Sequence, residues 1–197
     1  MSGARGARPL EFAPRGPLRG EAKLRAALDA FAISVDGRIA LDVGAAAGGF
    51  VRVLLERGAR RVYAVDAGHG QLLGSLRQDS RVVNLEATNL ALLDTVHIPD
   101  RVEIITVDVS YLSLASAVSQ LDRIDKAPGA HLVGLVKPMF ELRMATAPSD
   151  ATSVSEAAAR ASRGIAGCGW SVLGSMGSPV TGARGAREML LHARWPG

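Results

Sequence analysis

The chain has 197 residues, 48% of them hydrophobic and 21% charged, so it can bury a single core and is too apolar to be disordered. Its one cysteine, Cys168, excludes an internal disulfide and a cysteine-rich metal site, and we expect no bound metal. No apolar run approaches the roughly 20 residues that cross a bilayer, and no hydrophobic leader is present, so we expect no membrane partner and a cytoplasmic location. The formal net charge of +4 weakly favours an anionic partner such as nucleic acid.

Residues 1–20 contain four arginines among glycine and proline and predict a flexible basic arm, which either follows phosphates or is merely solvated. We place a single domain at residues 21–197. Apolar residues at helical spacing predict a helix over 21–32. The apolar run 39–43 predicts a buried strand that ends in a glycine-rich turn, and helical spacing resumes from Phe50 to Gly58.

The alternation of strands and helices continues to the end of the chain. Further strands are expected at 61–66, 81–86, 102–108 and 130–137, and helices at 71–77, 113–125 and 152–166. Two last strands, 170–175 and 188–193, follow each other without a helix, which indicates an antiparallel hairpin. The predicted fold is therefore α/β, a Rossmann-like, doubly wound sheet of seven strands, mostly parallel, with an antiparallel last strand.

The turn after the first strand has small residues at every position from Gly44 to Gly49. Gly44 allows a sharp bend and the close approach of a ligand, while Gly48 and Gly49 open the next helix with free N–H groups. The turn has neither the G-x-G-x-x-G spacing of dinucleotide enzymes nor the lysine of a P-loop. Asp42 would repel a pyrophosphate and suits a cation, so S-adenosylmethionine is favoured over NAD, although a purely structural acid explains this turn equally well.

Polar residues are expected to meet at the carboxyl ends of the parallel strands, where such sheets bind ligands. Asp66 can accept hydrogen bonds from both ribose hydroxyls of an adenosine, a feature that NAD enzymes share. Lys137 ends an apolar strand, where its charge must either be paired or escape to solvent. The predicted cofactor-binding residues are Asp42, Gly44, Ala45, Ala46, Gly48, Gly49, Phe50, Asp66, Glu86, Thr88, Asn89 and Asp108.

Several motifs occur in order along the chain, and the set is more specific than any one of them. They are Leu41-Asp42-Val43-Gly44 with Gly48-Gly49-Phe50, Arg61-Val62-Tyr63-Ala64-Val65-Asp66, Gly70-Gln71-Leu72, Val107-Asp108-Val109-Ser110, and Leu135-Val136-Lys137-Pro138 with Phe140-Glu141. Over about residues 19–192 this set resembles the FtsJ-like ribose 2′-O-methyltransferases, and among them the TlyA branch, which acts on ribosomal RNA.

The resemblance implies a class I methyltransferase fold, S-adenosylmethionine as the methyl donor and RNA, specifically ribosomal RNA, as the acceptor. It also implies a catalytic Lys-Asp-Lys-Glu tetrad at Lys23, Asp108, Lys137 and Glu188. Lys137 would be the general base for the ribose 2′-hydroxyl, whose oxygen attacks the sulfonium methyl in line. From the residues alone, Lys23 could not be preferred over Arg25, nor Glu188 over Glu141.

Three departures from the family pattern concern the acceptor and the donor. Only the basic arm precedes Lys23, where TlyA-type proteins carry an S4-like RNA-binding domain. The turn has alanine at 45–47 where hydroxyl and glycine residues are more usual, and residues 142–148 replace a glycine- and lysine-rich continuation. An alternative is therefore an O-methyltransferase that modifies a small-molecule hydroxyl, such as a nucleoside-like natural product, and a third is a non-catalytic binding protein. RNA predicts a basic surface beside the pocket, whereas a small acceptor predicts a closed pocket.

Overall fold

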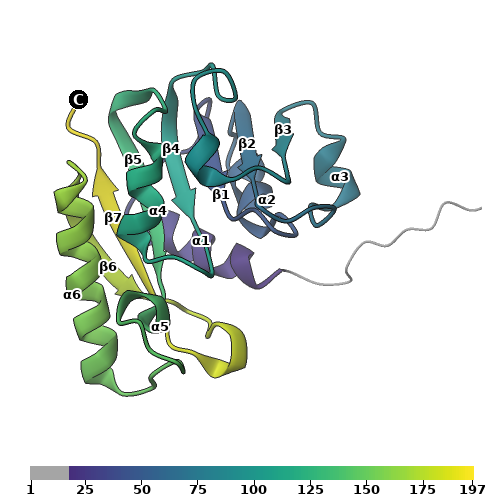
Figure 1. Ribbon diagram of the computed structural model, residues 1–197. Helices are drawn as coiled ribbons and strands as arrows, with labels where there is room; N and C mark the ends of the chain where they lie inside the picture. Colours follow the sequence, from purple (N-terminus) through teal and green to yellow (C-terminus); the bar gives the residue numbers. More distant parts are fainter. Residues whose placement is uncertain (1–17) are drawn as a thin grey trace, which may run out of the picture.

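The computed structural model describes residues 18–197 (Figure 1). Its centre is a seven-stranded sheet in the order β3-β2-β1-β4-β5-β7-β6. The strands are β1 (Ile39–Val43), β2 (Arg61–Val65), β3 (Val82–Leu85), β4 (Val102–Val107), β5 (Lys126–Val136), β6 (Ser171–Gly177) and β7 (Met189–Arg194). The first five strands pair in parallel, and β7 is antiparallel to both of its neighbours. The predicted α/β fold is confirmed.

Helices cover both faces of the sheet. They are α1 (Arg19–Ala30), α2 (Gly49–Glu56), α3 (Gly74–Arg77), α4 (Leu114–Val118), α5 (Pro138–Glu141) and α6 (Ala151–Gly167), with 3-10 turns η1 (Leu90–Leu92), η2 (Ser119–Leu121) and η3 (Ala183–Gly185). The apolar sides of α1 and α2 belong to one core cluster and those of α4 and α6 to the other. Figure 1 shows α4 and α6 in front of the sheet and α1 and α2 behind it. No helix among residues 18–197 is both long and apolar enough to span a membrane.

The first helix begins at Arg19, so the predicted boundary at residue 20 falls inside α1. The Glu21 carboxylate accepts a hydrogen bond from the backbone N–H of Leu18 at 3.1 Å, which satisfies one of the N–H groups that a helix start leaves free. Residues 1–17, which make up the rest of the predicted arm, lie outside the described residues.

Two helices are shorter than the apolar spacing indicated. The helix expected over 71–77 is reduced to α3, because the N–H groups of Gln71 and Leu72 donate to the Glu86 carboxylate and hold this segment as a loop. The helix expected over 113–125 is α4 followed by the turn η2. In both places a local polar contact or a 3-10 turn shortens the helix that the spacing of apolar residues predicts.

The expected hairpin of the last two strands is present, but β7 lies between β5 and β6. Val136, the last residue of β5, pairs with Met189, the first residue of β7. The adjoining residues, Lys137 and Glu188, therefore leave the sheet at the same end. The antiparallel insertion of β7 thus brings together two residues that are 51 positions apart in the sequence.

Candidate active site

Three neighbouring strands end at the same level of the sheet. Val43, the last residue of β1, pairs with the last residues of β2 and β4. The next residues on these three strands are Gly44, Asp66 and Asp108, respectively. A glycine turn and two carboxylates therefore meet at the carboxyl edge, where doubly wound sheets bind ligands.

Gly44 must lack a side chain for this arrangement. Its φ is +86°, and a Cβ atom there would lie 2.3 Å from the backbone carbonyl oxygen of Asp108. Any larger residue would push the turn away from β4 and would also strain the backbone. The glycine thus brings β1 and β4 into close contact at the point where Asp108 begins.

The alanine run at 45–47 is oriented by Asp66. Ala46 has a φ of +44°, which is unusual for a residue with a side chain, and its N–H donates to Asp66 Oδ2 at 2.8 Å. The other oxygen, Asp66 Oδ1, accepts from the N–H of Gly68 at 2.7 Å. Two backbone contacts therefore fix the carboxylate at the end of β2.

A cavity of about 220 Å³, which we call the strand-end cavity, opens beside these residues. Its lining includes five of the predicted cofactor-binding residues, namely Gly44, Ala46, Asp66, Thr88 and Asp108. Two of these are acids, and no lysine, arginine or histidine from residues 18–197 lines it. A cationic ligand therefore suits this cavity, whereas a pyrophosphate would meet two carboxylates.

Sequence reasoning missed several residues that also line the strand-end cavity, among them Gln71, Ser110 and Tyr111. Gln71 belongs to one of the ordered motifs, so its place in that motif was a signal that could have included it. Tyr111 follows Asp108 by three residues and is 57% exposed. An exposed aromatic residue so close to a strand end was an available signal for a ligand contact.

The remaining predicted cofactor residues do not line the strand-end cavity. Ala45, Gly48, Gly49 and Phe50 form the turn and the start of α2 without lining the cavity. Asn89 accepts a hydrogen bond from the N–H of Ala91 and caps η1. These residues shape the turn and its surroundings.

Glu86 is occupied by protein groups and does not line the strand-end cavity. Hydrogen bonds from the side chain of Asn84 and from the backbone N–H of Leu72 lower its pKa to about 2, despite some desolvation, and the N–H of Gln71 and the guanidinium of Arg77 act in the same direction. The carboxylate therefore fixes the loop before α3, whereas we expected Glu86 to contact the cofactor.

Asp42 lies buried beneath the glycine turn. Its Oδ1 accepts a hydrogen bond from the hydroxyl of Thr106 at 2.6 Å, while Oδ2 has no hydrogen-bond partner among the described residues. Burial raises the pKa of Asp42 to about 7, the charges of Asp108 and Asp66 act in the same direction, and the Thr106 hydrogen bond opposes them. Asp42 thus contributes a titratable charge behind the cavity.

The four residues of the predicted tetrad form two ion pairs. Lys23 Nζ lies 2.6 Å from Glu188 Oε2, and both side chains are buried. Lys137 Nζ lies 2.5 Å from Asp108 Oδ1 and donates a hydrogen bond to Ser110 Oγ at 2.7 Å. Residues from α1, from the ends of β4 and β5, and from the start of β7 are thereby assembled at one site.

A second cavity, of about 530 Å³, is lined by Lys23, Lys137 and Glu188, and we call it the lysine cavity. Ser110 lines both this cavity and the strand-end cavity. Asp108 lines the strand-end cavity and pairs with Lys137, which lines the lysine cavity. The two cavities therefore meet at one charged contact.

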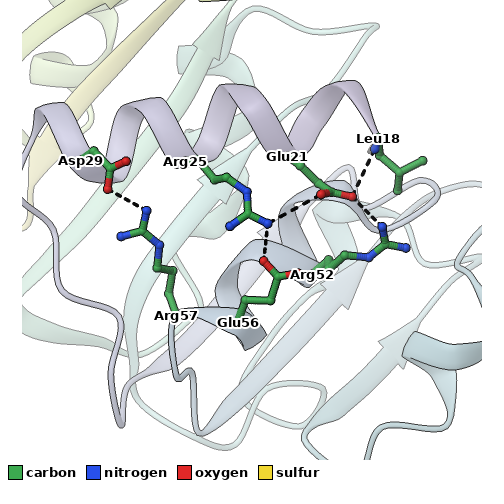
Figure 2. Close-up of polar contacts among 7 residues, drawn as sticks. All are labelled: Leu18, Glu21, Arg25, Asp29, Arg52, Glu56 and Arg57. Atoms are coloured by element: carbon green, nitrogen blue, oxygen red, sulfur yellow. Dashed lines mark hydrogen bonds and ion pairs between the residues drawn. The ribbon is translucent and has the colours of Figure 1, made fainter. Parts of the chain in front are cut away.

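Helix α1, which carries Lys23, is attached to α2 by charged side chains. Figure 2 shows this α1–α2 ladder, made of Glu21 with Arg52, Arg25 with Glu56, and Asp29 with Arg57. The Glu21–Arg52 and Asp29–Arg57 contacts measure 2.6 and 2.7 Å. Since α2 follows the glycine turn directly, the ladder connects the helix of Lys23 to the wall of the strand-end cavity.

Comparison with known proteins identifies the family. The model of the FtsJ-like methyltransferases matches residues 18–195. The chain belongs to the FtsJ-like methyltransferase family. It is 42% identical over 181 residues to the 16S/23S rRNA (cytidine-2′-O)-methyltransferase TlyA of Mycobacterium tuberculosis, an alignment that covers 89% of this chain and 67% of that protein. The YqxC protein of Bacillus subtilis, whose name proposes an rRNA methyltransferase, is 37% identical over 96% of this chain and 68% of its own length.

Solved structures share the fold of this chain. A hemolysin-named protein of Streptococcus thermophilus superimposes with a TM-score of 0.86 at 34% identity, covering 94% of this chain and 69% of that one. The N-methyltransferase NodS of Bradyrhizobium japonicum, solved with S-adenosyl-L-homocysteine, shares the fold with a TM-score of 0.59 at 17% identity, over 91% of this chain and 86% of its own. The chain thus spans about two thirds of the length of its TlyA-type relatives.

The predictions of an FtsJ-like, TlyA-like chain and of an S-adenosylmethionine-dependent O-methyltransferase are confirmed. S-adenosylmethionine is the methyl donor of this FtsJ-like enzyme. The strand-end cavity fits this donor, because its charged lining residues are both acids and the donor carries a sulfonium and an ammonium group.

Proposed function

We propose that this chain is a ribose 2′-O-methyltransferase that acts on RNA, with ribosomal RNA as the acceptor. The observation that carries the proposal is the contact between the strand-end cavity and the lysine cavity at Asp108, Ser110 and Lys137. A methyl donor in the strand-end cavity and an acceptor hydroxyl in the lysine cavity would meet at the amine of Lys137. The named activity of the Mycobacterium tuberculosis relative supports a ribose 2′-hydroxyl as that acceptor.

Residues that line the strand-end cavity would hold the donor. Asp66 would accept hydrogen bonds from its ribose hydroxyls, and the backbone at Gly44 and Ala46 would contact its amino-acid part. When bound there, S-adenosylmethionine supplies a methyl group on a sulfonium that is prone to displacement. The charge of Asp108 at the boundary between the cavities favours the cationic end of the donor near Lys137.

Lys137 would accept the proton of the acceptor hydroxyl. Its amine must be unprotonated for this step, and Asp108 and Ser110 hold Nζ at 2.5 and 2.7 Å, so the nitrogen is already positioned. Lys23 and Glu188 line the same cavity as a buried pair, which keeps their charges fixed while a ribose enters. Holding the hydroxyl in line with the methyl group contributes most of the expected rate enhancement.

The distribution of charge between the cavities supports a polyanionic acceptor. Among residues 18–197, the charged residues of the strand-end cavity are both acids, whereas the lysine cavity contains Lys23, Lys137 and Arg184 and one acid, Glu188. The exposed Arg184 lies at the 3-10 turn η3, on the loop that leads to Glu188. A basic rim beside the pocket is the feature that an RNA acceptor predicts.

Radiolabelled methyl transfer from S-adenosylmethionine tests the proposal, with ribosomal subunits, naked ribosomal RNA and a small-molecule extract assayed in parallel. We expect label in RNA, at a position that resists alkaline hydrolysis because its 2′-oxygen is methylated. Label confined to small molecules would overturn the RNA acceptor and favour the tailoring enzyme. Label on a base would overturn the ribose assignment.

The role of Lys137 is tested by Lys137→Ala, with Lys126→Ala as a matched control because Lys126 is a lysine of β5 that contacts backbone carbonyl oxygens away from both cavities. We expect Lys137→Ala to lower methyl transfer by roughly a thousandfold or more, in the range that general acid–base groups and orientation supply. Binding of S-adenosylmethionine, measured by calorimetry, should change by less than about threefold. A variant with normal turnover would contradict the assignment.

A further inference from the structure

A third cavity, of about 330 Å³, adjoins the lysine cavity at helix α5. Met139 and Phe140 of α5 line both cavities. The third cavity is also lined by two arginines, Arg143 from the loop after α5 and Arg160 from α6, and we call it the arginine cavity. It is therefore an immediate neighbour of the site that contains Lys137.

The two arginines have no partner within the described chain. Both are exposed, and neither forms an ion pair or a side-chain hydrogen bond with any of residues 18–197. In contrast, Arg52 and Arg57 of the α1–α2 ladder each contact a carboxylate (Figure 2). Arg143 and Arg160 are thus free to bind an anion without first breaking an internal contact.

Arg143 occupies a backbone position that favours glycine. It follows Leu142, the C-cap of α5, with a φ of +55°, and the N–H of Met144 donates to the carbonyl oxygen of Met139 at 2.9 Å. This is the left-handed end of a helix, where a side chain strains the backbone and glycine is usual. Arginine is present here although the backbone conformation favours glycine, so replacement by glycine removes the charge without straining the loop.

The other polar groups of the arginine cavity are compatible with an anion. Glu141 is the one acid among residues 18–197 in its lining, and its Oε1 accepts from the N–H of Leu114 at 2.6 Å. Burial raises the pKa of Glu141, while the charge of Arg160 acts against this effect. Two cations therefore face a single buried carboxyl. Ser113 and Ser116 also line the cavity, and their hydroxyls hydrogen-bond to each other at 2.7 Å, which leaves one O–H to donate to an anionic oxygen.

We propose that the arginine cavity binds the phosphate of a nucleotide adjacent to the one that is methylated. The inference rests on the RNA acceptor proposed above and names a subsite for it. With the target ribose at Lys137, the phosphodiester backbone continues past α5 and meets Arg143 and Arg160. Guanidinium groups suit this task because their paired N–H donors match phosphate oxygens. A single nucleoside fills only the lysine cavity, so the subsite favours polymeric acceptors over small ones.

The test measures methyl transfer to ribosomal RNA and RNA binding at several salt concentrations for Arg143→Gly, Arg160→Gln and the double variant. Arg143→Gly suits the left-handed backbone, so it removes the charge without straining the loop. Arg57→Gln is the matched control, because it also removes one surface arginine but on the α1–α2 ladder. Calorimetry with S-adenosylmethionine checks that the strand-end cavity is intact in each variant.

We expect each single variant to raise the KM for RNA roughly tenfold and the double variant by more, with kcat and donor affinity nearly unchanged. The slope of log K against log salt should become shallower by about 0.7 in the double variant, because one neutralised phosphate is lost and fewer counterions are released on binding. Arg57→Gln should match the wild type in both measurements.

Two results would overturn the subsite in distinguishable ways. In the first result, the wild-type enzyme methylates RNA and the double variant retains the wild-type KM and salt slope. This would contradict the subsite and leave the RNA acceptor in place. In the second result, the wild-type enzyme methylates only small molecules and the double variant acts on them normally. This would contradict both the RNA acceptor and the subsite.

Discussion

The arginines of this chain behave differently on two sides of the molecule. On the α1–α2 ladder each arginine faces a carboxylate (Figure 2). Around α5 and α6, Arg143, Arg160 and Arg184 line cavities and have no carboxylate within 4 Å among residues 18–197. The same residue type therefore joins two helices on one side and presents free charge beside the lysine cavity on the other. Net charge alone, at +4, does not reveal this separation.

The buried Lys23–Glu188 pair should give the largest effect on stability, well beyond that of the surface ladder. Glu188→Gln leaves a buried ammonium without its counter-charge, which should lower the free energy of unfolding by about 3 kcal/mol. The exposed Arg25–Glu56 pair is the reference, and Glu56→Gln should cost less than about 1 kcal/mol. Urea denaturation of both variants makes the comparison. Equal losses would show that burial does not distinguish the two pairs.

Asp42 adds a pH dependence that neither group of arginines should have. Its folded-state pKa, raised to about 7 by burial, lies above the ordinary value for an unfolded chain, so folding favours the protonated form. The contribution of Asp42 to the free energy of unfolding is fully present at pH values below its pKa in the unfolded chain and is lost as the pH rises towards 7. The free energy of unfolding should therefore fall by up to about 1.4 kcal/mol per pH unit over this range.

Asp42→Asn should remove this slope and make the protein more stable than the wild type at pH 8. Urea denaturation between pH 5 and pH 8 measures the effect. Because Arg57→Gln changes only an exposed pair, it should keep the wild-type slope and serves as the control. A slope that persists in Asp42→Asn would assign the titration to another group.

Glu21 tests the ladder at its most buried member. Its carboxylate contacts Arg52 at 2.6 Å and the N–H of Leu18 at 3.1 Å, so Glu21→Gln weakens both an ion pair and the helix start. We expect a loss of about 1–2 kcal/mol in the free energy of unfolding, with no change in the salt slope of RNA binding. A shallower salt slope would show that the ladder side also takes part in RNA binding.

Arg143→Gly should have the smallest effect on stability, and it should stabilise the protein where Glu188→Gln and Glu21→Gln destabilise it. Relief of the left-handed backbone should raise the free energy of unfolding by up to about 1 kcal/mol, while RNA binding weakens. Thermal unfolding of the purified variant measures this gain. A loss of stability would indicate that the Arg143 side chain contributes to folding. Arg143 would then resemble the arginines of the α1–α2 ladder, and the contrast between the two groups of arginines would be smaller.

Much of the site was predictable because parallel strands end together. Asp66, Asp108 and Lys137 each follow a buried strand, so their place at the carboxyl edge follows from local pattern and the α/β fold. Lys23 and Glu188 could be chosen only through the family resemblance, since neither adjoins a parallel strand end. Their contact depends on where α1 packs and on the insertion of β7 between β5 and β6.

Glu86 and Asn89, which we expected to contact the cofactor, show what local pattern does not determine. Glu86 follows the third strand as Asp66 follows the second, yet its carboxylate binds backbone N–H groups before α3 and does not line the cavity. Asn89 likewise caps a turn. Backbone N–H groups that lack a partner bind such side chains in place of a ligand. The positions of these N–H groups depend on the path of a loop, which no periodic pattern in the sequence predicts.

The sequence by itself determined the α/β alternation, the glycine turn and the acids and lysine at the strand ends, because each depends on periodicity or on a backbone angle that few residues adopt. The tertiary structure decided which charges are paired. Glutamate and arginine residues far apart in sequence meet on α1 and α2, whereas Arg143 and Arg160 line one cavity beside α5 and form no ion pair with an acid among residues 18–197. Pairing depends on distances of a few ångströms between separate elements, and those distances are set only when the helices pack on the sheet.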